Sequence, residues 1–291
     1  MQAITDGGLE TTLIYHHGAD LPEFAAFVLL DDEAGIELLR TYYAPYIEIA
    51  RRQGVRAILD TPTWRANADW GARLGYDAAR LADVNRRAVE LLESIRGERA
   101  GVEVSISGCI GPRGDGYVVG ETMTADEAAR YHAPQVQALA GADLVSAITM
   151  TYPAEAIGVV RAARTEGKPV VISFTVETDG RLPDGTALAS AVAEVDAETD
   201  GGAEYFMVNC AHPSHFADVL PVDRVLGVRA NASRMSHAEL DAAEELDEGD
   251  PVELAQDYAR LGRLQRLEIV GGCCGTDHRH VGAIAAALSG T

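Results

Sequence analysis

Short runs of β-branched and apolar residues alternate with longer amphipathic stretches along the whole chain. The run 170–172 is apolar at consecutive positions, which is typical of a strand covered by helices on both faces. From Ile36 to Ala50, apolar residues recur at spacings of three and four, which is typical of one helix face. The pattern predicts strands near 3–8, 57–61, 102–108, 144–149, 169–176, 205–210, 225–230 and 268–273. It predicts helices over 34–53, 77–97, 124–140, 153–166, 186–198 and 251–265.

Strands that alternate with helices in this way predict an α/β protein, a (β/α)₈ TIM barrel of one domain spanning residues 1–291. A doubly wound open sheet is the alternative, which periodicity does not separate from a barrel. Asp77 and Asp126 are expected to start helices. No linker rich in Pro, Gly or Ser interrupts the alternation.

The charge balance narrows the choice of partner. Acidic residues number 45 against 24 basic ones, and the net charge of −21 argues against nucleic acid or an anionic membrane. No apolar run approaches a membrane span, and the N-terminus lacks the pattern of a signal peptide. We therefore expect a cytoplasmic protein with reduced thiols that acts on small molecules. The sequence leaves the oligomeric state open.

Two further segments bear on function. Lys168, the only lysine, precedes a strand, which is the wrong end of a barrel for Schiff-base chemistry. The chain has no GxSxG, Walker A or GxGxxG motif. Acids dominate residues 239–250, which predicts a solvated loop or short helix, with a flap over the site as the alternative.

All four cysteines fall at or just past the C-terminal ends of predicted strands, where barrel enzymes place catalytic groups. They are Cys109, Cys210, Cys273 and Cys274. If the last strand ends at Gly272, the preceding glycines free the backbone and both adjacent thiols can turn toward one point. With Cys210 they would supply the three protein ligands of a catalytic Zn²⁺, leaving the fourth position for substrate.

Three thiolates make zinc electron-rich, which suits it to hold a substrate thiolate rather than to split water. Reduced core cysteines are the alternative, because free cysteine is commonly a small buried hydrophobe. Histidines after the same strands offer a competing ligand set, but we interpret them as surface residues or as supports behind the ligands. They are His212, His215, His278 and His280.

At these residues the sequence resembles the homocysteine S-methyltransferase family, over nearly the whole chain. The most specific parts are Val208-Asn209-Cys210 and Gly271-Gly272-Cys273-Cys274-Gly275-Thr276. The resemblance implies a zinc-dependent barrel that methylates a thiol, usually homocysteine, to give methionine. It implies Cys210, Cys273 and Cys274 as zinc ligands, and Asp6, Gly7 and Gly8 as the loop that holds the amino-acid part of the substrate. Asn209 and Thr149 are further candidates for substrate binding.

One position departs from the family pattern. Many members carry a glutamate at the end of strand four that receives the substrate's amino group, and Ile148 occupies its place here. An ammonium without a carboxylate loses a hydrogen bond worth about 1.5–3 kcal/mol. Either Glu10, Glu121 or Glu177 serves instead, or the thiol is not a standard amino acid.

The expected function is therefore zinc-dependent S-methyl transfer from a sulfonium or betaine donor to a thiol, with homocysteine as the first choice. A small donor is preferred because no glycine loop of the Rossmann type is present. Trp64 can face the donor cation, or pack against a neighbouring loop. The alternatives are the same site acting on a different thiol or selenol, and a non-catalytic protein that binds zinc or thiols.

Overall fold

The structure, a computed structural model, describes residues 1–289. Each strand pairs in parallel with the next, and the first also pairs with the last, so the sheet closes into a barrel. The strands are β1 (Ala3–Thr5), β2 (Arg56–Asp60), β3 (Val104–Ile110), β4 (Leu144–Met150), β5 (Val170–Phe174), β6 (Phe206–Asn209), β7 (Val225–Ala230) and β8 (Ile269–Gly272). The closing register pairs Ala3 with Ile269, which confirms the (β/α)₈ barrel and excludes an open sheet.

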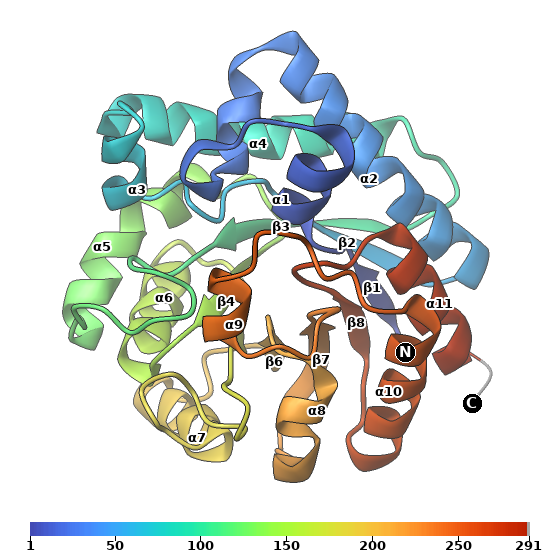
Figure 1. Cartoon of the computed structure of the whole chain (residues 1–291). Helices are drawn as coiled ribbons and strands as arrows, with labels where there is room; N and C mark the ends of the chain where they lie inside the picture. The colour runs from blue at the N-terminus through green and yellow to red at the C-terminus, as the bar shows by residue number, and fades with distance from the viewer. Residues whose placement is uncertain (290–291) are drawn as a thin grey trace.

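Helices surround the strands, as Figure 1 shows. The long ones are α2 (Glu33–Gln53), α4 (Ala78–Gly97), α5 (Ala125–Ala138), α6 (Pro153–Thr165), α7 (Leu188–Thr199), α10 (Pro251–Leu264) and α11 (His278–Ser289). The short ones are α1 (Leu9–Thr11), α3 (Ala68–Arg73), α8 (Pro213–Phe216) and α9 (His237–Asp241), with a π-helix at Thr12–His16 and 3₁₀ turns at Pro22–Phe24, Ala26–Asp31 and Ala217–Val219. All six predicted helices are present, and α11 is an addition to them.

Helix starts follow side-chain capping. Asp77 caps α4, and its carboxylate accepts a hydrogen bond of 2.8 Å from the backbone N–H of Arg80. The expectation that Asp126 starts the next helix is wrong. Thr124 caps α5, because its hydroxyl accepts from the Glu127 N–H while the Glu127 carboxylate accepts from the Thr124 N–H. Asp126 lies within the first turn instead.

The interior of the barrel changes character along its axis. Near the N-terminal ends of the strands it is filled by buried apolar side chains, namely Ala3, Ile58, Val171, Met207 and Ile269. Because side chains two residues apart share a strand face, the next layer holds Thr5, Asp60, Ser173 and Asn209, which are all buried and polar. The barrel is therefore closed by apolar packing at one end and becomes polar toward the other.

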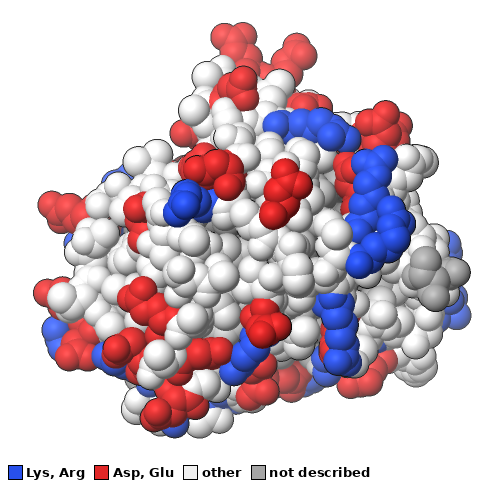
Figure 2. All heavy atoms as spheres, turned by 90° about the horizontal axis from the view of Figure 1, so that it is seen from below, with Lys and Arg blue, Asp and Glu red and all other residues white. Residues whose placement is uncertain are grey.

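Charged side chains are spread over the surface. Figure 2 shows acidic and basic side chains interspersed over one face of the molecule. Lys168 donates a hydrogen bond of 2.8 Å to the Ala142 carbonyl just before β5, on the side away from the C-terminal strand ends. Among the helices of residues 1–289, none has the length and apolar character needed to cross a bilayer.

Candidate active site

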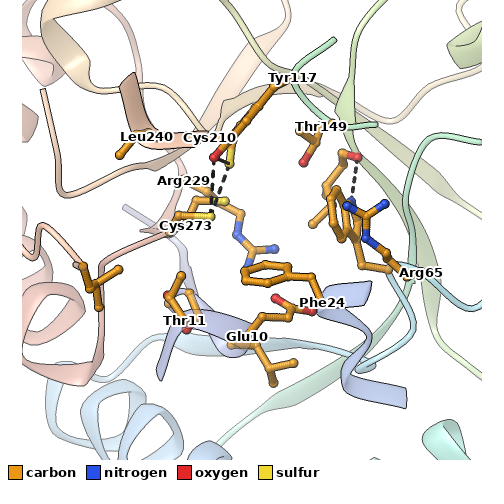
Figure 3. A pocket seen from close by; sticks show the side chains of 18 of the residues that line it. Glu10, Thr11, Phe24, Arg65, Tyr117, Thr149, Cys210, Arg229, Leu240 and Cys273 are labelled. Carbon is orange, nitrogen blue, oxygen red and sulfur yellow. Dashed lines mark hydrogen bonds between the residues drawn. The ribbon is translucent and has the colours of Figure 1, made fainter. Parts of the chain in front are cut away.

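A cavity of about 350 Å³ opens at the C-terminal ends of the strands, the end at which barrel enzymes carry their sites. Its wall includes Cys210, Cys273 and Cys274, and the Asp6–Gly8 loop. Figure 3 shows sulfur atoms on one side of the cavity and aromatic and charged side chains on the other. The volume lies in the range of sites for small molecules.

The three predicted ligand cysteines converge. Their sulfurs all lie within 4.8 Å of one another, and Sγ of Cys210 is 3.6 Å from Sγ of Cys274. Two sulfurs bound to one tetrahedral zinc at 2.3 Å would be about 3.8 Å apart. The sulfur positions therefore fit a zinc ion. Within residues 1–289 no other trio of His, Cys, Asp or Glu forms such a cluster.

The backbone around the cysteines is tightly constrained. Cys210 adopts a left-handed conformation with φ of 56°, which costs a non-glycine residue about 1–3 kcal/mol and is typical of functional sites. Gly271 and Gly272 are not left-handed, so the expectation that they free the backbone is wrong. They are required for close packing, because a Cβ at either position would collide with the Oγ1 atom of Thr5 or of Thr276.

A stacked pair of rings lies beside the sulfurs. The Tyr117 hydroxyl lies 3.4 Å from Sγ of Cys210 and 3.7 Å from Sγ of Cys274. Its ring stacks on His237 at 4.0 Å between centroids. Nδ1 of His237 is 3.0 Å from a carboxylate oxygen of Glu177, and its Nε2 is 2.8 Å from the Cys210 carbonyl oxygen. Glu177 therefore supports the ring behind the cluster and does not line the cavity.

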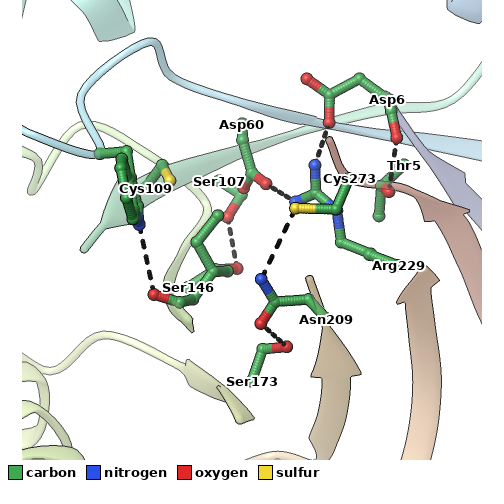
Figure 4. Close-up of polar contacts among 12 residues, drawn as sticks. Thr5, Asp6, Asp60, Ser107, Cys109, Ser146, Ser173, Asn209, Arg229 and Cys273 are labelled. Atoms are coloured by element: carbon green, nitrogen blue, oxygen red, sulfur yellow. Dashed lines mark hydrogen bonds and ion pairs between the residues drawn. The ribbon is translucent and has the colours of Figure 1, made fainter. Parts of the chain in front are cut away.

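An ion triad lies at the base of the cavity, where Figure 4 shows Arg229 between Asp6 and Asp60. Arg229 donates to Asp6 Oδ1 at 2.6 Å and pairs with Asp60 through its other terminal nitrogen. Although burial opposes the charge, Asp60 and Asp6 hold the pKa of the Arg229 guanidinium well above its usual range. Tyr42 also donates to Asp6, at 3.2 Å. The Asp6 carboxylate is thus committed to internal contacts.

The backbone atoms of the first loop lie close to the cluster. A Cβ at Gly8 would lie 2.6 Å from the Cys273 carbonyl oxygen and 2.5 Å from Oγ1 of Thr11. Only glycine allows this approach of the β1 loop to the cysteine pair. Asp6, Gly7 and Gly8 all line the cavity, as a substrate-holding loop must.

The end of β4 bends at the position of the missing glutamate. The register between β4 and β5 shifts between Ala147 and Met150, and Thr149 has φ of 63°. Ile148 and Thr149 both line the cavity. Position 148 therefore faces the cavity, and an apolar side chain is present there.

Asn209 holds this bend. Its Oδ1 accepts hydrogen bonds from the Thr149 N–H at 2.9 Å and from the Ser173 hydroxyl at 2.7 Å. Its Nδ2 donates to Oγ1 of Thr149 at 2.8 Å and lies 3.8 Å from Sγ of Cys273. Because Asn209 is fully buried and outside the cavity wall, it connects Thr149 to Cys273 rather than contacting substrate. The structure thus places Asn209 behind the cavity wall, and substrate binding by Asn209 stays a prediction.

Trp64 lies in the cavity wall, packed against its neighbours. Its Nε1 lies 3.4 Å from the Ile148 carbonyl, and the Arg65 guanidinium lies 4.6 Å from its ring centroid. One ring face already carries a cation, which favours the packing alternative for Trp64. Cys109 is a buried thiol outside the sulfur cluster, and burial raises its pKa well above the usual range.

The acidic segment 239–250 is the exposed short helix and loop that its composition predicts, and it also reaches the cavity. Leu240, Asp241, Glu245, Leu246 and Asp247 contribute to the cavity wall, and α9 is drawn in front of the strands in Figure 1. The segment therefore covers part of the mouth. The histidines do not join the sulfur cluster: His212 caps α8, and His280 lies 3.1 Å from Asp277.

Sequence reasoning missed Arg229, Asp60, Tyr117 and Arg65. Arg229 had a signal, since an arginine inside the apolar run 225–230 requires buried acids as partners. Tyr117 and Arg65 lie in loops, where neither periodicity nor spacing indicates which way a side chain points.

Comparisons with known proteins agree with this geometry. A model of the family described as homocysteine S-methyltransferase matches residues 3–288. The oxidized form of the homocysteine methyltransferase MmuM from Escherichia coli is 23% identical, with a TM-score of 0.75 over 98% of this chain and 95% of that one. Its metallated form is 21% identical, with a TM-score of 0.74 over 98% and 96%. No curated protein matches the sequence.

Proposed function

Since the chain belongs to the homocysteine S-methyltransferase family, we propose that it transfers a methyl group from a small sulfonium or betaine donor to the thiol of homocysteine, giving methionine. The observation that carries this proposal is the convergence of three cysteine sulfurs on one cavity. Cys210, Cys273 and Cys274 would hold zinc and leave one position open. When bound, the ion would lower the pKa of the substrate thiol so that a nucleophilic thiolate forms at neutral pH.

The transfer itself is a displacement in line. The thiolate sulfur forms a bond to the methyl carbon, while the bond from that carbon to the donor's sulfur or nitrogen breaks. The electron pair of that bond stays on the donor sulfur or nitrogen, which thereby loses its positive charge. The protein's task is to hold the two partners in one geometry, which accounts for much of the acceleration of such reactions.

Charges around the mouth support a cationic donor. Asp115, Asp241, Glu245 and Asp247 all line the cavity. Arg65 also lines the cavity, but these four carboxylates outnumber it, and an excess of one charge sign raises the local concentration of ligands of the opposite sign. Sulfonium and betaine donors carry their positive charge on the atom that bears the methyl group. The carboxylates would therefore attract the end of the donor that takes part in the reaction.

Because position 148 is an isoleucine, the amino group of homocysteine needs a carboxylate from another residue. Of the three glutamates considered, Glu10 lines the cavity, whereas Glu177 pairs with His237 and Glu121 is exposed away from the wall. Burial raises the pKa of Glu10 to about 7. No side-chain hydrogen bond or ion pair joins the Glu10 carboxylate to another residue in the described part of the chain. We infer that Glu10 receives the ammonium.

Glu10→Gln is therefore expected to raise KM for homocysteine by roughly ten- to a hundredfold, the equivalent of about 1.5–3 kcal/mol. Steady-state kinetics with varied homocysteine measures this, and Glu121→Gln serves as the control that should leave KM unchanged.

An unchanged KM in Glu10→Gln would favour the alternative that Ile148 suggests, an acceptor without an ammonium. Thiols such as 3-mercaptopropionate would then compete well with homocysteine, and Ile148→Glu would shift preference toward homocysteine.

A screen of thiols against sulfonium and betaine donors, read by mass spectrometry of the methylated product, tests the proposed function. Methionine from homocysteine is the expected product. Methylation of another thiol or of a selenol alone would support the alternative substrate. Absence of product from every pair, in a protein that binds zinc, would support a non-catalytic binding protein.

A further inference from the structure

Arg65 occupies an unusual position in the loop after β2. Its guanidinium stacks on the indole of Trp70, 3.5 Å from the ring centroid, and lies 4.6 Å from the centroid of Trp64. Its side chain is only 10% exposed, and it lines the cavity. Figure 3 shows it across the cavity from Cys210 and Cys273. The aromatic rings fix the plane of the guanidinium but contact only its faces.

The in-plane N–H groups of Arg65 lack acceptors. Its Nε and Nη1 are buried without a hydrogen-bond partner. Its Nη2 is 3.9 Å from Oδ2 of Asp115, which is beyond hydrogen-bond distance. No residue from 1 to 289 accepts a hydrogen bond from this guanidinium. Buried donors normally have partners, and a buried charge is costly without them, so this one is built for a ligand that completes it.

We propose that Arg65 is the receptor for a carboxylate carried by one of the two substrates. The inference rests on the proposed function and adds a specificity-determining residue to it. A guanidinium held in plane carries its N–H groups in the fork that matches the two oxygens of a carboxylate, and Nη2, the one nitrogen of this guanidinium that is not fully buried, is the atom that a ligand in the cavity would reach first. The geometry thus selects a thiol or a methyl donor that bears an aliphatic carboxylate.

Both substrates of the proposed reaction can supply that group, and each has an analogue without it. Homocysteine is compared with 3-aminopropane-1-thiol, which has the same thiol and ammonium. S-methylmethionine is compared with trimethylsulfonium, and glycine betaine with tetramethylammonium. The substrate whose carboxylate binds Arg65 is the one that binds more weakly when Arg65 is replaced.

The variants are Arg65→Met, which removes the charge, and Arg65→Lys, which keeps the charge but loses the paired donors. Arg73→Met is the matched control, because Arg73 stacks on the same indole at 4.3 Å, is 59% exposed and lies outside the cavity wall. Circular dichroism establishes that each variant is folded.

Isothermal titration of the zinc-loaded proteins with each ligand, together with steady-state kinetics, gives the answer. Arg65→Met should weaken binding and raise KM of the carboxylate-bearing substrate by about ten- to a hundredfold, with kcat changed much less. Arg65→Lys should give a smaller loss, whereas Arg73→Met should bind as the wild type does. Analogues without the carboxylate should bind wild type and Arg65→Met alike.

Three results would overturn the proposal. The first is equal binding of every carboxylate ligand by wild type and Arg65→Met. The second is an equal loss of affinity for ligands with and without the carboxylate. The third is a loss of the same size in Arg73→Met. Wild-type protein that binds none of the carboxylate ligands would overturn it as well. Turnover is measured separately from binding. Ligand binding that depends on Arg65, without any methylated product, would contradict the proposed function but not the role of Arg65 as a carboxylate receptor.

Discussion

Cys273→Ala is expected to abolish stoichiometric zinc binding, and so are Cys210→Ala and Cys274→Ala. Their sulfurs lie within 4.8 Å of one another, and a site with three protein ligands does not keep its affinity after losing one. Metal analysis of purified protein should give about one zinc per chain in the wild type and far less in each variant. Methyl transfer should fall with the zinc content.

Cys109→Ala is the matched control for these variants. Its thiol also lies at the end of a strand and lines the cavity, but it is outside the sulfur cluster. The variant should therefore retain one zinc per chain. Full zinc retention by Cys273→Ala, or zinc loss in Cys109→Ala matching that in Cys273→Ala, would contradict the assignment of the ligands.

Arg229→Met is expected to be the most destabilising of the single changes considered. Arg229 is 4% exposed and pairs with Asp6 and Asp60, so its removal leaves two buried carboxylates without their counter-charge. Breaking such a buried ion pair costs about 3–5 kcal/mol, which corresponds to a fall in Tm of roughly 6–20 °C. Thermal unfolding followed by circular dichroism measures the difference.

Two comparisons make this prediction sharper. Arg51→Met removes an exposed ion pair with Glu48, which solvent screens, so it should change Tm little. The triple change Arg229→Met, Asp6→Asn and Asp60→Asn should be less destabilised than Arg229→Met alone, because no uncompensated charge remains. A Tm for Arg229→Met equal to that of Arg51→Met would show that the triad does not stabilise the barrel.

Much of the fold could be predicted from local patterns. The spacing of apolar residues from Ile36 to Ala50 identified α2, and consecutive apolar residues at 170–172 identified β5. Closure could not be predicted in this way, because it depends on pairing between β1 and β8, which lie at opposite ends of the chain. A periodicity reports which face of an element is buried but not which element covers it.

The candidate site, like the fold, could be predicted from local patterns only in part. Cysteines that follow parallel strands meet at one end of a barrel, so strand order predicted that the thiols lie at the same end, but it does not separate Cys109 from the three that cluster. The contacts of Arg229 with Asp6 join residues more than two hundred positions apart, which no local pattern records. The choice of Glu10 over Glu121 and Glu177 likewise needed the path of the loops. Composition predicted that the acidic segment is exposed, but its place at the cavity mouth, where Leu240 and Leu246 contribute to the wall, could not be predicted from charge.

The central claim is that the sulfur cluster supports methyl transfer to homocysteine. The most direct measurement incubates the protein with homocysteine and a donor labelled with deuterium in its methyl group, and follows labelled methionine by mass spectrometry. The account predicts labelled methionine from the zinc-loaded protein, none after a chelator has removed the metal, and recovery when Zn²⁺ is restored. Labelled methionine formed at an undiminished rate by fully demetallated protein would contradict it.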